Sequence, residues 1–175
     1  MKNIFFDEPK KIIKISRKLR KELNVTIKVK DKEVTIDGKP EDEFVAEKVI
    51  DALRLDFPVD VALLIKDEDC LFEILNIKDY THRKDLATIR SRIIGKEGGT
   101  LRTLNNLTDC NFEIKDNEVG IIGSADNIEN AQKAVVSIIQ GSKQANVYSF
   151  LEKHHPEPIL DLGLKEPKKK KKDKE

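Results

Sequence analysis

The sequence predicts an α+β protein built from two copies of one small module. The chain has 175 residues, a length that suits two domains of roughly 70–90 residues each. It matches itself at an offset of 85 residues, and each copy combines alternating apolar runs with amphipathic helical stretches. These observations favour two tandem modules, each a three-stranded sheet packed by helices.

The repeat is clearest in the segments that we expect to form β-hairpins. Residues 25–29 align with 110–114, and residues 33–38 align with 118–123. In each segment the apolar side chains recur at every second position, which is typical of a strand with one buried face. A short polar turn separates the two strands of each hairpin.

Helical patterns lie on both sides of each hairpin. Apolar residues at helical spacing predict helices after the hairpins, and further helical and extended stretches come before them. The expected order in each module is strand, helix, hairpin, helix and short helix. In the first module these are 4–6, 10–23, the hairpin, 44–53 and 58–65, and in the second 71–77, 85–107, the hairpin, 128–139 and 143–153.

A polar break and a change of composition predict the domain boundaries. Lys66-Asp67-Glu68-Asp69 separates the modules, and the residues after His155 include Pro156, Pro158, Gly163 and a run of lysines. We therefore expect modules at 1–66 and 67–155 and a disordered basic tail at 156–175.

The near-zero net charge conceals a segregation along the chain. The sequence has 33 Lys and Arg against 32 Asp and Glu. Residues 9–30 hold nine bases and one acid (net +8), residues 37–79 hold five bases and thirteen acids (net −8), and residues 82–102 hold six bases and two acids (net +4). Such blocks predict either faces of opposite sign, one suited to a polyanion, or surface ion pairs that stabilise the fold. Charge alone leaves both interpretations open.

Composition disfavours several classes of protein. No run approaches the roughly 18 apolar residues of a membrane span, and the N-terminus lacks the apolar stretch of a secretory signal. Two cysteines and three histidines form neither a disulfide framework nor a zinc motif. No nucleophile and base stand at a catalytic spacing. We therefore expect a cytoplasmic, non-catalytic protein without a metal or cofactor.

The second copy contains a glycine motif inside a helical pattern. Gly95 and Gly98 interrupt the pattern, which resumes over residues 101–107. Each glycine costs a helix about 1 kcal/mol relative to alanine, so the sequence indicates a turn between two helices. The free N–H groups at the start of the second helix favour phosphate, with Lys96 at the tip of the turn. The alternative is a plain connection between helices with no ligand.

The residues around this turn resemble the core of a type I KH domain, an RNA- or single-stranded-DNA-binding module. The resemblance covers residues 93–114 and rests on Ile94, Gly95, Gly98, Leu101, Leu104, Thr108 and the apolar alternation of 110–114. It implies a loop that clamps about four nucleotides by their sugar–phosphate backbone, beside an apolar groove for the bases. The sequence departs from the usual pattern at Glu97, an acid in the loop, and at Asp109, where glycine is common.

The resemblance implies RNA contacts by eleven residues. They are Arg92, Ile93, Ile94, Gly95, Lys96, Glu97, Gly98, Gly99, Leu101, Arg102 and Phe112. Gly95, Lys96 and Gly98 would approach the RNA backbone, and Arg92 and Arg102 would contact phosphates. The apolar members, together with Leu104, would form either the groove or the core beneath it.

The first copy has lost the loop. At the 85-residue offset, Gly95–Gly98 aligns with Lys10–Ile13, and no glycine lies between Met1 and Asp37. We therefore expect the first module to keep the sheet and helices without the nucleotide clamp. Its basic helix either contacts phosphates, through Lys11, Lys14, Lys18 or Lys21, or is a solvated face.

The paired modules, the degenerate first copy and the ending at 147–152 resemble one family: the archaeal two-KH proteins related to the eukaryotic small-subunit assembly factor called partner of Nob. That resemblance implies binding of single-stranded precursor ribosomal RNA near its 3′ end. It also implies cooperation with the endonuclease that matures this end and with translation initiation factor subunits. Two alternatives stay open: a protein-interaction adaptor that uses the acidic middle segment, and a nuclease.

Overall fold

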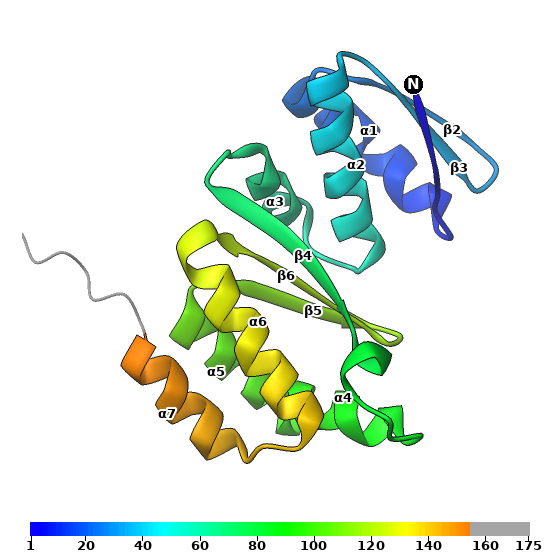
Figure 1. Cartoon of the computed structure of the whole chain (residues 1–175). Coiled ribbons are helices and arrows are strands. Elements are labelled where there is room, and N and C mark those ends of the chain that lie inside the picture. The colour runs from blue at the N-terminus through cyan, green and yellow to red at the C-terminus, as the bar shows by residue number, and fades with distance from the viewer. Residues whose placement is uncertain (155–175) are drawn as a thin grey trace, which may run out of the picture.

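The computed structural model describes residues 1–154; the tail predicted at 156–175 lies outside them. The fold is α+β, with one three-stranded antiparallel sheet in the N-terminal half (residues 1–66) and another in the C-terminal half (residues 67–154) (Figure 1). Both sheets have the hairpin strands adjacent and the first strand of the half on the far side of the second hairpin strand.

The N-terminal half alternates strands and helices as the sequence predicts. Its elements are β1 (Lys2–Phe5), α1 (Pro9–Leu23), β2 (Thr26–Lys30), β3 (Glu33–Asp37), α2 (Pro40–Arg54), α3 (Val59–Ala62) and the 3₁₀ turn η1 (Leu63–Lys66). The sheet order is β1-β3-β2. Proline opens both long helices, where its missing N–H costs no hydrogen bond.

The C-terminal half repeats this plan with an addition. Its elements are β4 (Cys70–Asn76), η2 (Ile77–Tyr80), α4 (Leu86–Ile94), η3 (Lys96–Gly98), α5 (Gly99–Thr108), β5 (Asn111–Lys115), β6 (Glu118–Ser124), α6 (Ala125–Gln140) and α7 (Gln144–His154). The sheet order is β4-β6-β5. The predicted helical stretch at 85–107 is thus two helices joined by the glycine turn.

The two halves also match at single backbone residues. Asn24 and Asp109 end α1 and α5 in the left-handed conformation, with φ of 53° and 50°. Asp31 and Asp116 turn the two hairpins, both at φ 53°. Each pair is 85 residues apart, and Asn and Asp are the non-glycine residues that best tolerate this conformation. Glycine is common in KH domains at the position of Asp109 because the backbone there requires a positive φ.

The N-terminal half lacks more than the glycine turn. Only residues 6–8 separate β1 from α1, whereas η2, α4 and η3 all lie between β4 and α5. Because α1 and α5 end at equivalent residues, α1 corresponds to α5 and nothing in the N-terminal half corresponds to α4. The N-terminal half therefore lacks both the glycine loop and the helix that precedes it in the C-terminal half.

The central strand of the second sheet, β6, is buried on both faces. On β6, Val119 and Ile121 pack with the helices of the C-terminal half, while the alternate residue Ile122 belongs to the apolar core of the N-terminal half. A Cβ atom at Gly120 would lie 2.6 Å from the ring of Phe57 and 2.8 Å from Leu55. The absent side chain of Gly120 therefore makes room for the N-terminal half.

Aromatic packing completes this contact. Phe57 follows α2 and meets Phe72 of β4 edge to face, with ring centroids 6.1 Å apart and an interplanar angle of 89°. Both rings are buried. The region around α3 thus covers the sheet face opposite α5 and α6 (Figure 1).

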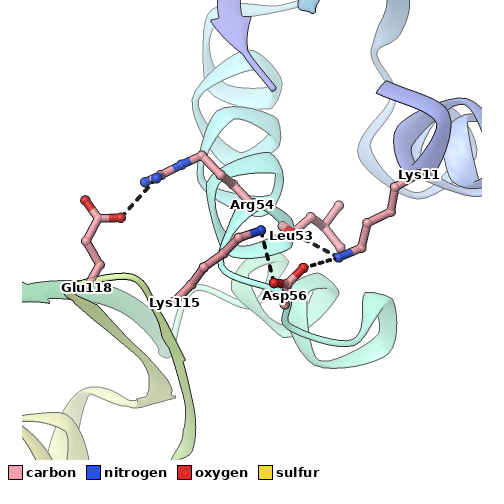
Figure 2. Close-up of polar contacts among 6 residues, drawn as sticks. All are labelled: Lys11, Leu53, Arg54, Asp56, Lys115 and Glu118. Carbon is pink, nitrogen blue, oxygen red and sulfur yellow. Dashed lines mark hydrogen bonds and ion pairs between the residues drawn. The ribbon is translucent and has the colours of Figure 1, made fainter. Parts of the chain in front are cut away.

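Ion pairs lie at the edge of the contact between the two halves (Figure 2). Asp56 lies between two lysines, 2.6 Å from Lys11 Nζ and 3.0 Å from Lys115 Nζ, and Arg54 Nη1 lies 2.9 Å from Glu118 Oε2. Partial burial disfavours the Asp56 carboxylate, but the hydrogen bonds from Lys11 and Lys115 outweigh it, so its pKa lies below the ordinary value. These pairs join α1 and the end of α2 to the β5–β6 hairpin.

The charge blocks of the sequence meet in space. Basic α1 pairs with the acidic segment through Lys11–Asp56 and Lys18–Asp60, and Lys66 reaches back to Glu22 on α1. The structure therefore supports the ion-pair interpretation for this part of the charge, in place of two fully separate faces.

Candidate nucleic-acid interface

Gly95 makes the sharp turn that ends α4. Its φ of 75° and ψ of 175° belong to a region that only glycine occupies readily. A Cβ atom at this position would lie 2.6 Å from the backbone nitrogen of Thr100 and would overlap the Thr100 hydroxyl. Glycine is thus needed here for α4 to come close to the first turn of α5.

The outer side of the turn is open at Gly98. This residue has φ 74°, and apart from its immediate chain neighbours no described residue comes within 4 Å of the place where its Cβ would be. The Cβ position of Gly99 is equally unobstructed beyond its own helix. Lys96 and Glu97 are exposed at the tip, and Glu97 itself has φ 53°. The described chain does not plug the loop, so a ligand backbone can approach it closely.

A residue at the beginning of α7 connects the two helices that flank the loop. The amide nitrogen Nε2 of Gln144 donates hydrogen bonds to the carbonyl of Arg92 and to Oγ1 of Thr100, both at 2.9 Å. It thereby links the last turn of α4 to the first turn of α5. Sequence reasoning missed Gln144, because nothing in the local pattern identifies partners 52 and 44 positions away.

Basic side chains surround the turn, and two of them also make internal bonds. Arg102 Nη2 donates to the carbonyl of Glu97 at 2.7 Å, and Arg92 Nη2 donates to the carbonyl of Ser142 at 2.6 Å. A guanidinium has five N–H donors, so each arginine keeps donors for a ligand. Lys96 is the exposed cation at the tip.

A further arginine comes near Arg92. A Cβ atom at Gly141 would lie 3.6 Å from a terminal nitrogen of Arg83 and 3.8 Å from one of Arg92. The two guanidinium groups therefore converge on the turn between α6 and α7. Sequence reasoning counted Arg83 only as part of a basic block.

Burial separates the predicted apolar residues into two groups. Ile93, Leu104 and Phe112 belong to the core, and Phe112 is 4% exposed. Ile94 is 37% exposed and Leu101 is partly buried. Ile94 and Leu101 thus form the surface beside the loop, and Ile93 and Phe112 support it from beneath.

The β5–β6 turn is tied to α4. Arg90 Nη1 donates to the carbonyl of Asp116 at 3.0 Å and to Oδ1 of Asn117 at 2.7 Å. The flanking residues Lys115 and Glu118 contact the N-terminal half (Figure 2). The β5–β6 turn and its flanking residues therefore contact both the N-terminal half and α4, the helix that leads into the glycine turn.

Other candidate groups have structural roles. Burial raises the pKa of the Cys110 thiol to about 11, although a hydrogen bond with Thr108 opposes the shift. Cys110 is thus a buried, unreactive side chain, packed where Gly123 leaves space. Within residues 1–154, no group of three or more His, Cys, Asp or Glu side chains is placed to hold a metal ion, and no helix is long and apolar enough to cross a membrane.

Comparison with known proteins identifies the C-terminal half. Residues 71–156 match the family profile of the second KH domain of PNO1, described as a eukaryotic-type KH domain (KH-domain type I). The matched range contains the turn, the helices on either side and the second sheet from Leu71 onward.

Relatives extend the similarity beyond this range. The KH domain-containing protein MJ0443 of Methanocaldococcus jannaschii is 30% identical over 146 residues, 79% of this chain and 64% of that protein. The pre-rRNA-processing protein pno1 of Aspergillus oryzae is 35% identical over 111 residues, 61% of this chain and 43% of that protein. The chain thus aligns with less than two thirds of the length of either relative.

A solved structure shares the fold. A chain in the crystal structure of an a/eIF2alpha–aDim2p–rRNA complex from Pyrococcus horikoshii superposes with a TM-score of 0.80 at 23% identity, covering 88% of this chain and 93% of that chain. The superposition spans most of both halves. It shows the shared fold, and the profile and the relatives confirm the resemblance seen in the sequence: this chain is related to the Pno1 proteins, and its residues 71–156 belong to their family of type I KH domains.

Proposed function

We propose that the chain is a non-catalytic ribosome-assembly factor that binds single-stranded RNA through the α4–α5 loop. In this proposal residues 1–66 form a degenerate KH-like module and residues 67–155 a complete KH domain. The lysine-rich segment 156–175 adds affinity that does not depend on sequence.

The open edge at Gly98 is the observation that carries the proposal. The loop is built so that Gly95 allows the close approach of two helices, while Gly98 and Gly99 leave space on the outside. At the beginning of α5, backbone N–H groups and the helix dipole favour an anion. A sugar–phosphate backbone fits this site because it is anionic and needs close access to the protein main chain.

The side chains around the loop have distinct proposed roles. Lys96, Arg92 and Arg102 neutralise phosphates, and Ile94 and Leu101 contact the bases. Ile93 and Phe112 hold this surface in place from the core. Glu97 lowers the positive potential at the tip and thereby limits affinity for arbitrary polyanions.

The names of the relatives suggest the RNA. The Aspergillus oryzae relative is a pre-rRNA-processing protein, and the Pyrococcus horikoshii complex contains rRNA and a/eIF2alpha. We therefore propose small-subunit precursor rRNA near its 3′ end as the ligand. The endonuclease that matures this end and initiation factor subunits are the proposed protein partners. The adaptor alternative has less support, because Asp56 and Asp60 of the acidic segment are already paired with α1.

A binding measurement with loop variants tests this function. Lys96→Asp with Glu97→Asp, or Gly98→Asp alone, should abolish binding of a short fluorescent single-stranded RNA, because each places a carboxylate against the phosphates. Lys133→Asp on α6 makes the same charge change as the double variant and should bind normally. Circular dichroism checks that every variant is folded. Unchanged affinity in the folded loop variants would refute the use of this loop.

The Glu97→Lys variant adds an independent test of the tip. It should bind RNA more tightly, since it replaces a repulsive charge by an attractive one. Weaker binding would show instead that the Glu97 carboxylate makes a specific contact with the RNA.

A further inference from the structure

Helix α1 of the N-terminal half carries a row of exposed cations. Lys10, Lys14, Arg17 and Lys21 are all exposed, and their spacing of four, three and four residues places them on one face of the helix. At 1.5 Å per residue the row extends about 16 Å. We refer to these four residues as the α1 basic stripe.

The stripe has no internal partner in the part of the chain that the structure describes. Within residues 1–154, none of its four side chains forms an ion pair or a hydrogen bond to another side chain. The lysines that pair with the acidic segment, Lys11 and Lys18, lie on the adjacent face of the helix. Of the four lysines that the sequence analysis considered as phosphate contacts, Lys11 and Lys18 are ion-paired, whereas Lys14 and Lys21 belong to the stripe.

Few carboxylates compensate the stripe. The single acid of α1, Glu22, lies 3.7 Å from Lys66. Asp7 and Glu8 border the N-terminal end of the helix, and Asp7 is paired with Lys32. The exposed apolar residue on the same face is Ile13, which is 57% exposed. The face is thus strongly cationic and carries its charge on flexible side chains.

The repeat gives the stripe a position that corresponds to the loop. Helices α1 and α5 end at Asn24 and Asp109, the equivalent left-handed residues, and each leads into the first strand of its hairpin. At the 85-residue offset Lys10 aligns with Gly95, and Arg17 aligns with Arg102. The N-terminal half therefore presents cations where the C-terminal half presents its glycine turn.

We infer that the α1 basic stripe is a second RNA site, which binds the phosphate backbone of a strand longer than the α4–α5 loop can hold. The inference rests on the proposed function, since the loop supplies the primary contact. Four long cationic side chains contact phosphates without reading bases. Each neutralised phosphate contributes about 0.7 to the slope of log affinity against log salt for a single strand. The stripe should therefore affect salt dependence and strand length, and leave base preference unchanged.

The test compares two full-length variants of equal net charge. One replaces the stripe (K10Q/K14Q/R17Q/K21Q). The other removes four lysines that the structure pairs with carboxylates (K18Q/K32Q/K66Q/K133Q). Affinity is measured against salt for two single-stranded RNAs. One is about 6 nucleotides long, just beyond the roughly four that a KH loop clamps, and the other is about 30 nucleotides long.

The stripe variant should lose at least about tenfold in affinity for the long RNA, with a slope lower by about 2 to 3. It should bind the short RNA as the wild type does, and the control variant should resemble the wild type on both. Equal affinity and slope for the two variants on the long RNA would overturn the inference, as would a loss confined to the short RNA. The half-variants K10Q/K14Q and R17Q/K21Q give the same comparison if the quadruple variant folds poorly.

A parallel Gly98→Asp variant separates the two proposals. If it binds the short RNA normally, the proposed use of the loop fails. In that case the comparison of the stripe and control variants on the long RNA still tests whether the stripe binds RNA.

Discussion

The two glycines of the loop should differ sharply in their tolerance of alanine. Gly98→Ala places a methyl group in open space, so only the left-handed backbone should lower the free energy of unfolding, by about 1–2 kcal/mol. Gly95→Ala should lower the free energy of unfolding by more, for two reasons. The φ and ψ of Gly95 lie in a region that costs other residues about 1–3 kcal/mol.

The second cost at Gly95 is steric. The new Cβ would lie 2.6 Å from the nitrogen of Thr100, a backbone atom of α5 that cannot rotate away. Overpacking of this kind costs about 1–3 kcal/mol. Together the two effects predict a loss of about 2–6 kcal/mol in the free energy of unfolding for Gly95→Ala.

Urea unfolding followed by circular dichroism measures the difference. With an m value of about 2 kcal/mol per M, the midpoint of Gly95→Ala should fall by about 1–3 M, and that of Gly98→Ala by less than about 1 M. An unfolded Gly95→Ala beside a folded Gly98→Ala agrees with the same ranking. Equal stability of the two variants, within about 0.5 kcal/mol, would refute the assignment of Gly95 to the helix contact.

Three further predictions concern contacts away from the tip. Phe57→Ala should cost about 3–5 kcal/mol in urea unfolding, because it empties the hollow at Gly120 and removes the contact with Phe72; a loss below about 1 kcal/mol would contradict this contact. Gln144→Ala should accelerate amide hydrogen exchange over residues 95–101 and leave β2 and β3 unchanged, since it removes two hydrogen bonds worth about 1 kcal/mol each. Asp56→Asn should reduce the pH dependence of stability. The lowered pKa of Asp56 means that its contribution is present above the unfolded value of about 3.9 and is lost as the pH falls through the folded value. Because the group is about half exposed, the wild type should lose only about 1 kcal/mol or less relative to Asp56→Asn between pH 7 and pH 3.

Local patterns predicted the elements of this fold. The alternating residues at 25–29 and 110–114 became strands, and the two glycines at 95 and 98 became the turn between α4 and α5. These signals succeed because alternation, helical spacing and glycine placement depend on neighbouring residues. The repeat then supplied evidence that neither copy gave alone.

Long-range contacts could not be predicted in the same way. Ile93 and Ile94 are adjacent, apolar and helical, and only packing shows that the first is buried and the second exposed. Gln144 and Arg90 act through partners distant in the sequence. The pairing of Lys11 with Asp56 and Lys115 likewise depends on how the two halves meet.

The burial of β6 on both faces bears on how the C-terminal half would behave without the N-terminal half. A fragment beginning near Asp67 would expose to water Phe72, Ile122 and the space beside Gly120 that Phe57 fills. An uncovered apolar sheet face favours self-association. Leu55 and Phe57 therefore keep an apolar face of the second sheet away from water, whatever ligand the N-terminal half contacts.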